Sequence, residues 1–488
     1  MIMDKNFVVR PSLSVLSRAE IDAFYSSALD VLERVGVRVL HPEALQLLER
    51  AGAPASGDSI VRIRSVLVQD ALRTVPKRLM IYDREGNPAM ELGGGNRGGT
   101  NTYYGTGSDL KNTYDPHTGE LRLTVTQDIA DMARVVDALP NLDFLMSYGI
   151  PYDCPLETVF QTEFDAMVRN STKPIVFTSQ NAEDSRIIVG MAAAAAGGTE
   201  RLRRKPFVLN YTQPTSPLQH SSDGIGKLLA GADLEVPIVY PPGMMPGATA
   251  PVTVAGAITQ SLAEALSGLV IHQLKRMGAP IVLCGAHGCM DMHTAINVYA
   301  APERLLSEAA LAAIYQHFGV PTWGFGGCTD AHILDEQAGA EFGTLTMWAA
   351  LCGINLAHDV GYLGSGMIGD LRAVLMNNEI VGYVRHVLCR GIPVDHDTLA
   401  TDAIASAGPG GNYMGHEHTI RHFRTQLWRP AVFNRMDLGS WTRKGKNALK
   451  EVLAERLHAI LRDYAPKPLD PAVSEELDRL MPAEEARA

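Results

Sequence analysis

Short runs of apolar residues recur along the middle of the chain, and polar or turn-forming residues end each run. Most gaps between the runs hold a segment rich in alanine, leucine and glutamate with helical spacing. A strand–helix unit repeated about eight times predicts a (β/α)8 barrel, whose reactive groups cluster at the carboxyl ends of the strands. The predicted strands are 101–106, 144–150, 175–179, 207–211, 236–240, 280–285, 322–326 and 355–360.

The same pattern divides the chain into three parts. Residues 1–99 read as an N-terminal helical cap, in which Ser17 and Glu20 form a capping box at the start of a helix. Residues 100–392 form the predicted barrel, and residues 393–488 a C-terminal helical extension. The fold prediction is therefore an α/β TIM barrel with a cap and an extension. Its expected helices are 128–138, 157–170, 182–196, 223–230, 259–277, 302–318, 337–351 and 371–388.

Composition narrows the class of protein. A formal charge of -11 over 488 residues argues against a nucleic-acid partner, because phosphate binding needs a basic surface. We find neither an apolar run of about 18 residues nor the core of a secretory signal, so we expect a cytoplasmic protein without a membrane span. The six cysteines are too sparse for a disulfide scaffold. The sequence leaves open whether the chain forms a homo-oligomer.

Aromatic residues gather in or just after the predicted strands, whereas lysine and arginine are nearly absent there. Rings and carboxylates without cations suit a quaternary ammonium group, which is held by cation–π contacts. The alternative is that the rings only pack the barrel, since aromatic residues favour strands. The aromatic set is Tyr103, Tyr104, Tyr148, Tyr211, Tyr240, Trp323, Phe325 and Tyr362.

Three polar segments are further candidates. His287 and Cys289 follow one predicted strand and Cys328 follows the next, which would suit zinc, although the spacing matches no common zinc motif. A second polar segment, 330–337, enters a helix after a predicted strand. The third segment contains His416 and His418. It is either a segment that caps or packs against a helix, or part of a functional site.

Several separated motifs resemble the trimethylamine methyltransferase superfamily over about residues 10–480. The motifs are 246–256, Cys328-Thr-Asp-Ala with 335–339, Asn378-Glu379, and Gly408-Pro-Gly-Gly with His418-Thr419. The resemblance implies a TIM barrel that transfers a methyl group from a methylated amine to cob(I)alamin, a corrinoid carried by a separate partner protein.

The founding trimethylamine enzyme of that family carries pyrrolysine, thought to hold the amine as an adduct. This chain contains only ordinary amino acids. The resemblance therefore implies the pyrrolysine-free branch, whose members act on quaternary amines such as glycine betaine. A fixed positive charge makes the amine a good leaving group, so direct SN2 transfer needs no acid.

Within that scheme the site residues are assigned from their positions at strand ends. Asp330 and His358 are the predicted catalytic residues, with Asp330 offering compensating charge and His358 or Gln213 binding a substrate carboxylate. No metal is predicted in the site. The predicted substrate-binding residues are Tyr104, Tyr211, Gln213, Trp323, Phe325, Gln337 and Tyr362.

Two other functions remain alternatives. One is a zinc-dependent corrinoid methyltransferase acting on a thiol or alcohol, with His287, Cys289 and Cys328 as metal ligands. The other is a non-catalytic betaine-binding protein, because an aromatic cage alone suffices for binding.

Overall fold

Parallel β-pairing organises the centre of the chain in the computed structural model, which describes residues 13, 15–94, 101–285 and 288–481. One parallel sheet has the order β13-β12-β10-β9 and another the order β16-β17-β6. Isolated parallel bridges join Gly105 to Phe144, Leu145 to Ile175 and Leu283 to Thr322. The strands are β6 (Tyr103–Tyr104), β9 (Ile175–Phe177), β10 (Val208–Tyr211), β12 (Ile238–Val239), β13 (Ile281–Val282), β16 (Trp323–Phe325) and β17 (Leu356–His358).

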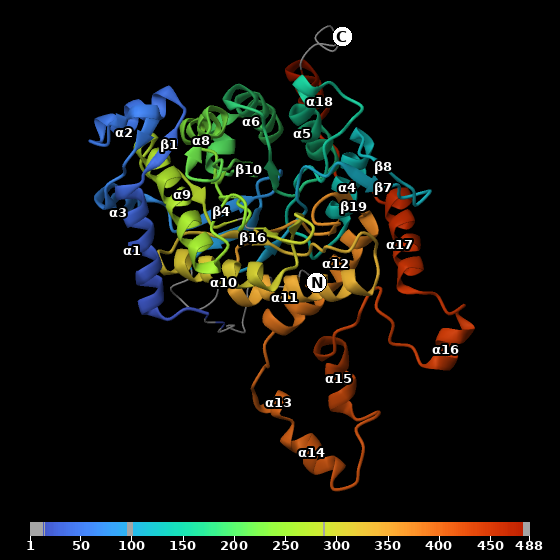
Figure 1. Ribbon diagram of the computed structural model, residues 1–488. Helices are drawn as coiled ribbons and strands as arrows, with labels where there is room; N and C mark the ends of the chain where they lie inside the picture. Colours follow the sequence, from blue (N-terminus) through green and yellow to red (C-terminus); the bar gives the residue numbers. More distant parts are fainter. Residues whose placement is uncertain (1–12, 14, 95–100, 286–287, 482–488) are drawn as a thin grey trace.

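Strands therefore form at seven of the eight predicted positions, and segment 144–150 takes part through isolated bridges. Helices separate these segments along the chain and pack around them (Figure 1), which gives an α/β fold. The strand residues are almost all buried, as expected where both faces of a parallel sheet are covered. The helices are α4 (Thr126–Ala138), α5 (Val159–Asn170), α6 (Ala182–Ala196), α8 (Ser222–Leu234), α9 (Val254–Lys275), α10 (Pro302–His317), α11 (Glu336–Cys352) and α12 (Leu371–Leu388).

Helix α9 is long and apolar enough to cross a membrane by length and composition. Its most apolar 18-residue window is 72% buried inside the protein, where α9 packs against α1, α3, α8 and α10. Burial in the core accounts for the apolar character of this helix.

The N-terminal elements cover one side and one end of this centre. The predicted capping box is present: Glu20 N donates to Ser17 Oγ (3.3 Å) and Ser17 N to Glu20 Oε2 (2.7 Å). The elements are α1 (Arg18–Arg34), β1 (Val37–Val39), α2 (Pro42–Arg50), β2 (Ala55–Ser56), β3 (Ile60–Val61), α3 (Ser65–Thr74), β4 (Arg78–Tyr82) and β5 (Pro88–Gly93).

The β4–β5 hairpin lies across the amino ends of the parallel strands. Tyr82 N donates to Pro206 O (2.9 Å), just before β10, and Arg84 N to Thr172 O (2.8 Å), just before β9. A covered amino end leaves the carboxyl ends of the strands as the accessible side.

Short elements inserted after the strands were not predicted. They are the sheet of β7 (Asn112–Tyr114), β8 (Leu121–Leu123), β18 (Tyr362–Leu363) and β19 (Ile368–Gly369), the hairpin of β14 (Cys289–Met290) and β15 (Asn297–Val298), and β11 (Gln219–His220). Helix α7 (Thr199–Arg204), between α6 and β10, was not predicted either. β11 pairs with β1 and so ties the N-terminal sheet to the centre.

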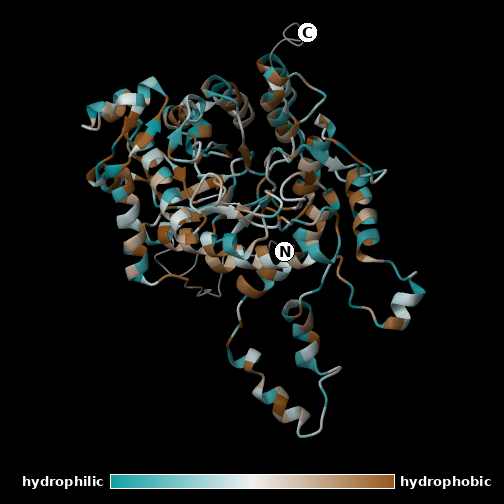
Figure 2. Cartoon of the chain, viewed as in Figure 1, coloured by the Kyte–Doolittle hydropathy of each residue, from teal (hydrophilic) through white to brown (hydrophobic). Residues whose placement is uncertain are grey.

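The C-terminal residues both pack on the centre and project from it. Helix α17 (Leu449–Asp463) packs against α4 and α12, and α18 (Pro471–Leu480) against α6. Between α12 and α17, an arm of residues 391–448 extends away from the body (Figure 1), except near Ala431, whose N donates to Glu379 Oε1 of α12 (2.7 Å). Ala403 is its one buried residue. Hydrophobic and hydrophilic residues alternate along it (Figure 2). The arm contains α13 (His396–Leu399), α14 (Thr401–Ala407), α15 (Glu417–Gln426) and α16 (Leu438–Arg443).

Gly268 of α9 lies so close to Tyr240 that an added Cβ would meet the ring at 2.1 Å. The Tyr240 hydroxyl lies 2.7 Å from His220 Nδ1, and His220 Nε2 lies 2.8 Å from Ser267 Oγ, so the ring is held in place. We expect Gly268→Ala to lower the free energy of unfolding by about 1–3 kcal/mol, measured by urea denaturation.

Gly190 of α6 is the matched control, because a Cβ there meets nothing within 4 Å. Since alanine favours a helix, Gly190→Ala should be neutral or stabilising by up to about 1 kcal/mol. Equal effects of the two substitutions would contradict the close approach at Tyr240.

Candidate functional site

A cavity of about 420 Å³ lies at the carboxyl ends of the parallel strands. Strands β10, β16 and β17 supply its wall where each strand ends, through Tyr211, Phe325 and His358. The other lining residues come from the loops and inserted elements that follow the strands. They are Ser108, Asp109, Met146, Gln213, Gly243, Met244, Met245, Thr249, Asn297, Tyr299, Asp359, Tyr362 and Gly366.

Four aromatic rings form much of this wall: Tyr211, Tyr299, Phe325 and Tyr362. The Tyr211 hydroxyl donates to Gln213 Oε1 (3.1 Å). The Tyr362 hydroxyl lies 2.7 Å from Tyr148 O and 2.9 Å from Ser108 O. Protein atoms therefore satisfy both of these hydroxyls. Aromatic faces attract cations through the ring quadrupole.

Asp330 holds the backbone of Tyr299 in the position from which its ring lines the cavity. Asp330 accepts hydrogen bonds from Tyr299 N (2.7 Å), Ala300 N (2.9 Å) and Ser365 Oγ (2.7 Å). Its carboxylate therefore ties the segment between β15 and α10 to the turn after β18. Asp330 positions Tyr299 and does not line the cavity.

His358 is buried and neutral at the end of β17. Its Nδ1 lies 2.6 Å from Gly324 O, and because a carbonyl can only accept, Nδ1 carries the proton. Burial lowers the pKa of His358 to about 3. Because the neutral ring carries its one proton on Nδ1, Nε2 is unprotonated at neutral pH. It lies 3.4 Å from Asp359 Oδ1. A neutral imidazole adds no positive charge to the cavity.

Two carboxyl groups, of Asp109 and Asp359, line the cavity. Burial raises the pKa of Asp359, and the neighbouring Asp109 raises it further. Burial likewise raises the pKa of Asp109. Both residues have positive φ, 70° for Asp109 and 63° for Asp359, as does Tyr148 with 71°. Strained backbone of this kind concentrates at functional sites, which makes these loops part of the candidate site.

The structure brings together five of the nine residues assigned from sequence: Tyr211, Gln213, Phe325, His358 and Tyr362 all line the cavity. Asp109, Asp359, Met244 and Met245 also lie in or just after predicted strands, but nothing in the sequence assigned them to the site. Tyr299 was missed because it follows the β14–β15 hairpin, far along the chain from the end of β13.

Trp323 and Tyr104 lie outside the cavity, which argues against a contact of either ring with substrate. Trp323 is fully buried beneath the wall, with its ring centroid 4.3 Å from that of His358 and 5.8 Å from that of Tyr211. Tyr104 is fully buried on the other side of its strand, where its hydroxyl donates to Thr346 O of α11 (2.8 Å).

Gln337 is exposed on the first turn of α11, and its Nε2 donates to Glu341 Oε1 (3.0 Å). Glu341 Oε2 accepts from Asp330 N (2.9 Å) and from the Thr329 hydroxyl. Gln337 and Asp330 thus belong to the support of the loop after β16, away from the cavity lining.

The zinc alternative finds no support among the described residues. His287 lies outside them. Cys328 is fully buried, and burial raises the pKa of its thiol, as it does for Cys289. A raised pKa disfavours the thiolate that binds metal. Within 15–94, 101–285 and 288–481, neither cysteine belongs to a group of three possible metal ligands.

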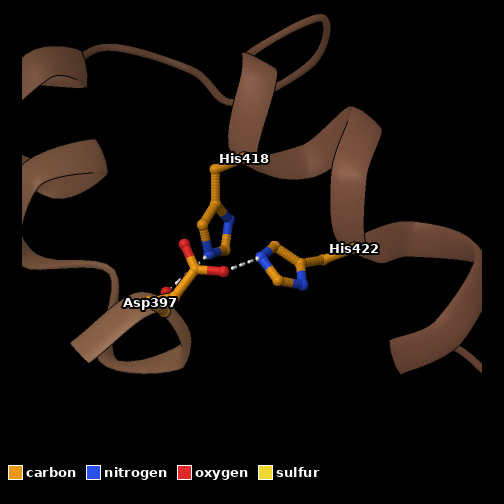
Figure 3. Close-up of side chains that lie close together, drawn as sticks. All are labelled: Asp397, His418 and His422. Atoms are coloured by element: carbon orange, nitrogen blue, oxygen red, sulfur yellow. Dashed lines mark hydrogen bonds and ion pairs between the residues drawn. The ribbon is translucent and has the colours of Figure 1, made fainter. Parts of the chain in front are cut away.

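The histidines of the arm join two of its helices (Figure 3). His422 Nε2 lies 2.9 Å from Asp397 Oδ2, and His418 Nε2 lies 3.1 Å from the backbone oxygen of Asp397. The three side chains could offer a cation one ligand atom each within 4.8 Å, but Arg421 already pairs with Asp397 Oδ1 at 3.0 Å. His416 caps α15 by accepting from His418 N (3.1 Å). The capping alternative is therefore confirmed for His416.

Comparisons with known proteins confirm the resemblance. The family model described as "Trimethylamine methyltransferase (MTTB)" matches residues 4–486. A trimethylamine methyltransferase of Desulfitobacterium hafniense (strain DSM 10664 / DCB-2) is 31% identical over 418 residues, which cover 86% of this chain and 83% of that protein. A glycine betaine methyltransferase of Desulfitobacterium hafniense (strain Y51) is 27% identical over 414 residues, 84% of each chain.

The fold also resembles a solved structure, the monomethylamine methyltransferase of Methanosarcina barkeri. The two match with a TM-score of 0.52 at 11% identity, over 96% of this chain and 84% of that one. This similarity concerns the fold. Together with the family match over nearly all of its length, it shows that the chain belongs to the trimethylamine methyltransferase family and is a methyltransferase.

Proposed function

We propose that this enzyme transfers a methyl group from a quaternary amine, of the glycine betaine kind, to the cob(I)alamin of a separate corrinoid protein. One observation carries the proposal: the cavity combines four aromatic rings with two carboxyl groups, and no lysine or arginine is among its described lining residues. Such a wall favours a ligand with a fixed positive charge and apolar methyl groups.

The proposed architecture is a closed (β/α)8 barrel. The parallel pairs and bridges run from β6 through 144–145, β9, β10, β12, β13, β16 and β17 and return from β17 to β6. In this proposal residues 1–99 form the cap, 100–392 the barrel and 393–488 the extension. Active sites of such barrels lie at the carboxyl ends of the strands, where the cavity lies. All six cysteines are free, which fits a reducing compartment such as the cytoplasm.

The proposed substrate binds with its ammonium group among the rings of Tyr211, Tyr299, Phe325 and Tyr362. Asp109 and Asp359 compensate its charge, and the neutral His358 does not repel it. A permanent charge removes the need for an adduct, so the absence of pyrrolysine from this sequence favours a quaternary amine over trimethylamine.

In the transfer itself, the nitrogen–carbon bond breaks and the amine leaves as a neutral tertiary amine, so no side chain needs to donate a proton. The corrinoid of the partner supplies the nucleophile that accepts the methyl group. No cysteine or lysine is among the described residues of this cavity, which fits an acceptor brought from outside. The chain contributes by desolvating the cation, orienting one methyl group and excluding water.

Tyr211 offers the sharpest test of the ring wall, because Trp323 is buried and its loss would leave a destabilising void. We expect Tyr211→Leu to weaken binding of a quaternary amine about 5- to 30-fold, the value of one cation–π contact. Tyr211→Phe keeps the ring and should retain the affinity. Calorimetric titration measures both, and equal losses in the two variants would argue against cation–π binding.

Methyl transfer should require a reduced corrinoid. With glycine betaine, carnitine, proline betaine and choline as donors and free cob(I)alamin as acceptor, we expect at least one donor to change the cobalamin absorption spectrum to that of methylcobalamin. Demethylation of a donor by the chain without any corrinoid would overturn the proposed acceptor.

The neutral state of His358 predicts a dependence of stability on pH. Its pKa is about 3 in the folded protein and about 6.5 in an unfolded chain, so between these values the unfolded state binds the extra proton. The free energy of unfolding therefore falls as the pH is lowered through this window. His358→Asn should reduce that slope by up to about 1.4 kcal/mol per pH unit.

Urea denaturation at pH 7, 6 and 5 checks this expectation. His396→Asn is the control, since the His396 side chain is 85% exposed. The same slope in wild type and His358→Asn would mean that His358 is not held neutral by burial.

A further inference from the structure

A second cavity, of about 460 Å³, adjoins the first and shares with it Asp109, Tyr211, Gln213, Gly243 and Thr249. Its chemistry is different. Hydroxyl groups and one ammonium group line it, together with the rings of Phe160 and the shared Tyr211 and the carboxyl group of Asp223. Its distinctive lining residues are Thr178, Ser179, Thr215, Ser216, Ser221 and Lys227.

Lys227 is a half-buried cation with an incomplete set of partners. It projects from α8, and its Nζ donates to Ser179 O at 2.8 Å. Among the described residues it forms no ion pair. An ammonium group has three N–H donors, so two remain for a ligand or solvent in the cavity.

Burial lowers the pKa of Lys227, and the nearby carboxyl groups of Asp109, Asp223 and Asp184 partly offset this effect. Asp184 accepts from Gln180 N (2.8 Å) and from Gln161 Nε2. Asp223 is exposed at the start of α8, where the helix dipole favours its charge. Asp109 lines both cavities, and in the proposed function it compensates the charge of the ammonium group.

The position of α8 adds to the attraction for an anion. Ser221, Asp223 and Gly224, at the amino end of this helix, line the second cavity together with Lys227. The amino end of a helix carries partial positive charge. A cation and a helix amino end therefore face one hydroxyl-lined space.

We propose that Lys227 binds the anionic group of the substrate, so that this enzyme prefers zwitterionic quaternary amines whose carboxylate reaches the second cavity. The inference rests on the proposed function, in which the ammonium group occupies the first cavity. The shared wall then separates the two charges of the substrate: rings and carboxyl groups receive the cation, and Lys227 receives the carboxylate.

The test compares substrates that share a trimethylammonium group but differ at the other end. Glycine betaine and carnitine carry a carboxylate, and choline carries a hydroxyl group. We expect Lys227→Met to weaken binding of the carboxylated amines about 10- to 100-fold, the value of a hydrogen bond to a charged group. Its affinity for choline should stay within about threefold of wild type. Lys227→Arg keeps the positive charge and should retain much of the preference for carboxylated amines over choline.

Calorimetric titration of the full-length protein gives the affinities, and circular dichroism shows whether each variant is folded. If Lys227→Met prevents folding, Lys227→Gln, which keeps N–H donors without the charge, serves instead. Equal weakening for choline and the carboxylated amines, or no weakening for either, would overturn the inference alone. Wild-type protein that binds none of these amines would overturn the proposed function and the inference with it.

Discussion

The hydrogen bonds to the Asp330 carboxylate hold the wall of the cavity together. They join Tyr299, on one inserted segment, to the turn at Ser365 on another. Asp330 is itself held by Glu341, which Gln337 contacts from the same helix. Such a carboxylate is a firm support, because its oxygens accept bonds from two backbone N–H groups and one serine hydroxyl. The position of Tyr299 therefore depends on a residue that does not line the cavity.

A buried cation lies beside the cavity. The Arg304 guanidinium stacks on Phe325, with its Cζ 4.3 Å from the ring centroid. Glu308 lies 3.7 Å from Arg304 Nη1 and also accepts a hydrogen bond from Phe325 N at 2.7 Å. The pair offsets its own charge and fixes Phe325 from two directions. Arg304 thus already covers one face of Phe325. In the proposed function, Tyr211, Tyr299 and Tyr362 are then the rings most available to the ammonium group.

The repeat of apolar runs was enough to predict the parallel strands and the helices between them, because burial on both faces leaves a strong pattern. The choice among strand-end residues was harder, since it depends on depth and on which way each side chain points. Trp323 and Phe325 share one side of β16, but Phe325 lies nearer the strand end and reaches the cavity. Tyr104 points to the helices. Tyr299 comes to the site through a hairpin and a carboxylate contact that no local pattern reveals.

The β4–β5 hairpin has a consequence for the sequence of events in catalysis. Because it covers the amino ends of the strands near Pro206 and Thr172, the carboxyl side is the open route into the centre. In the proposed reaction the bulky corrinoid protein would dock over that same carboxyl side. The small amine would then have to enter before the carrier arrives and could depart only after it lifts away, so turnover would follow a compulsory order of binding and release.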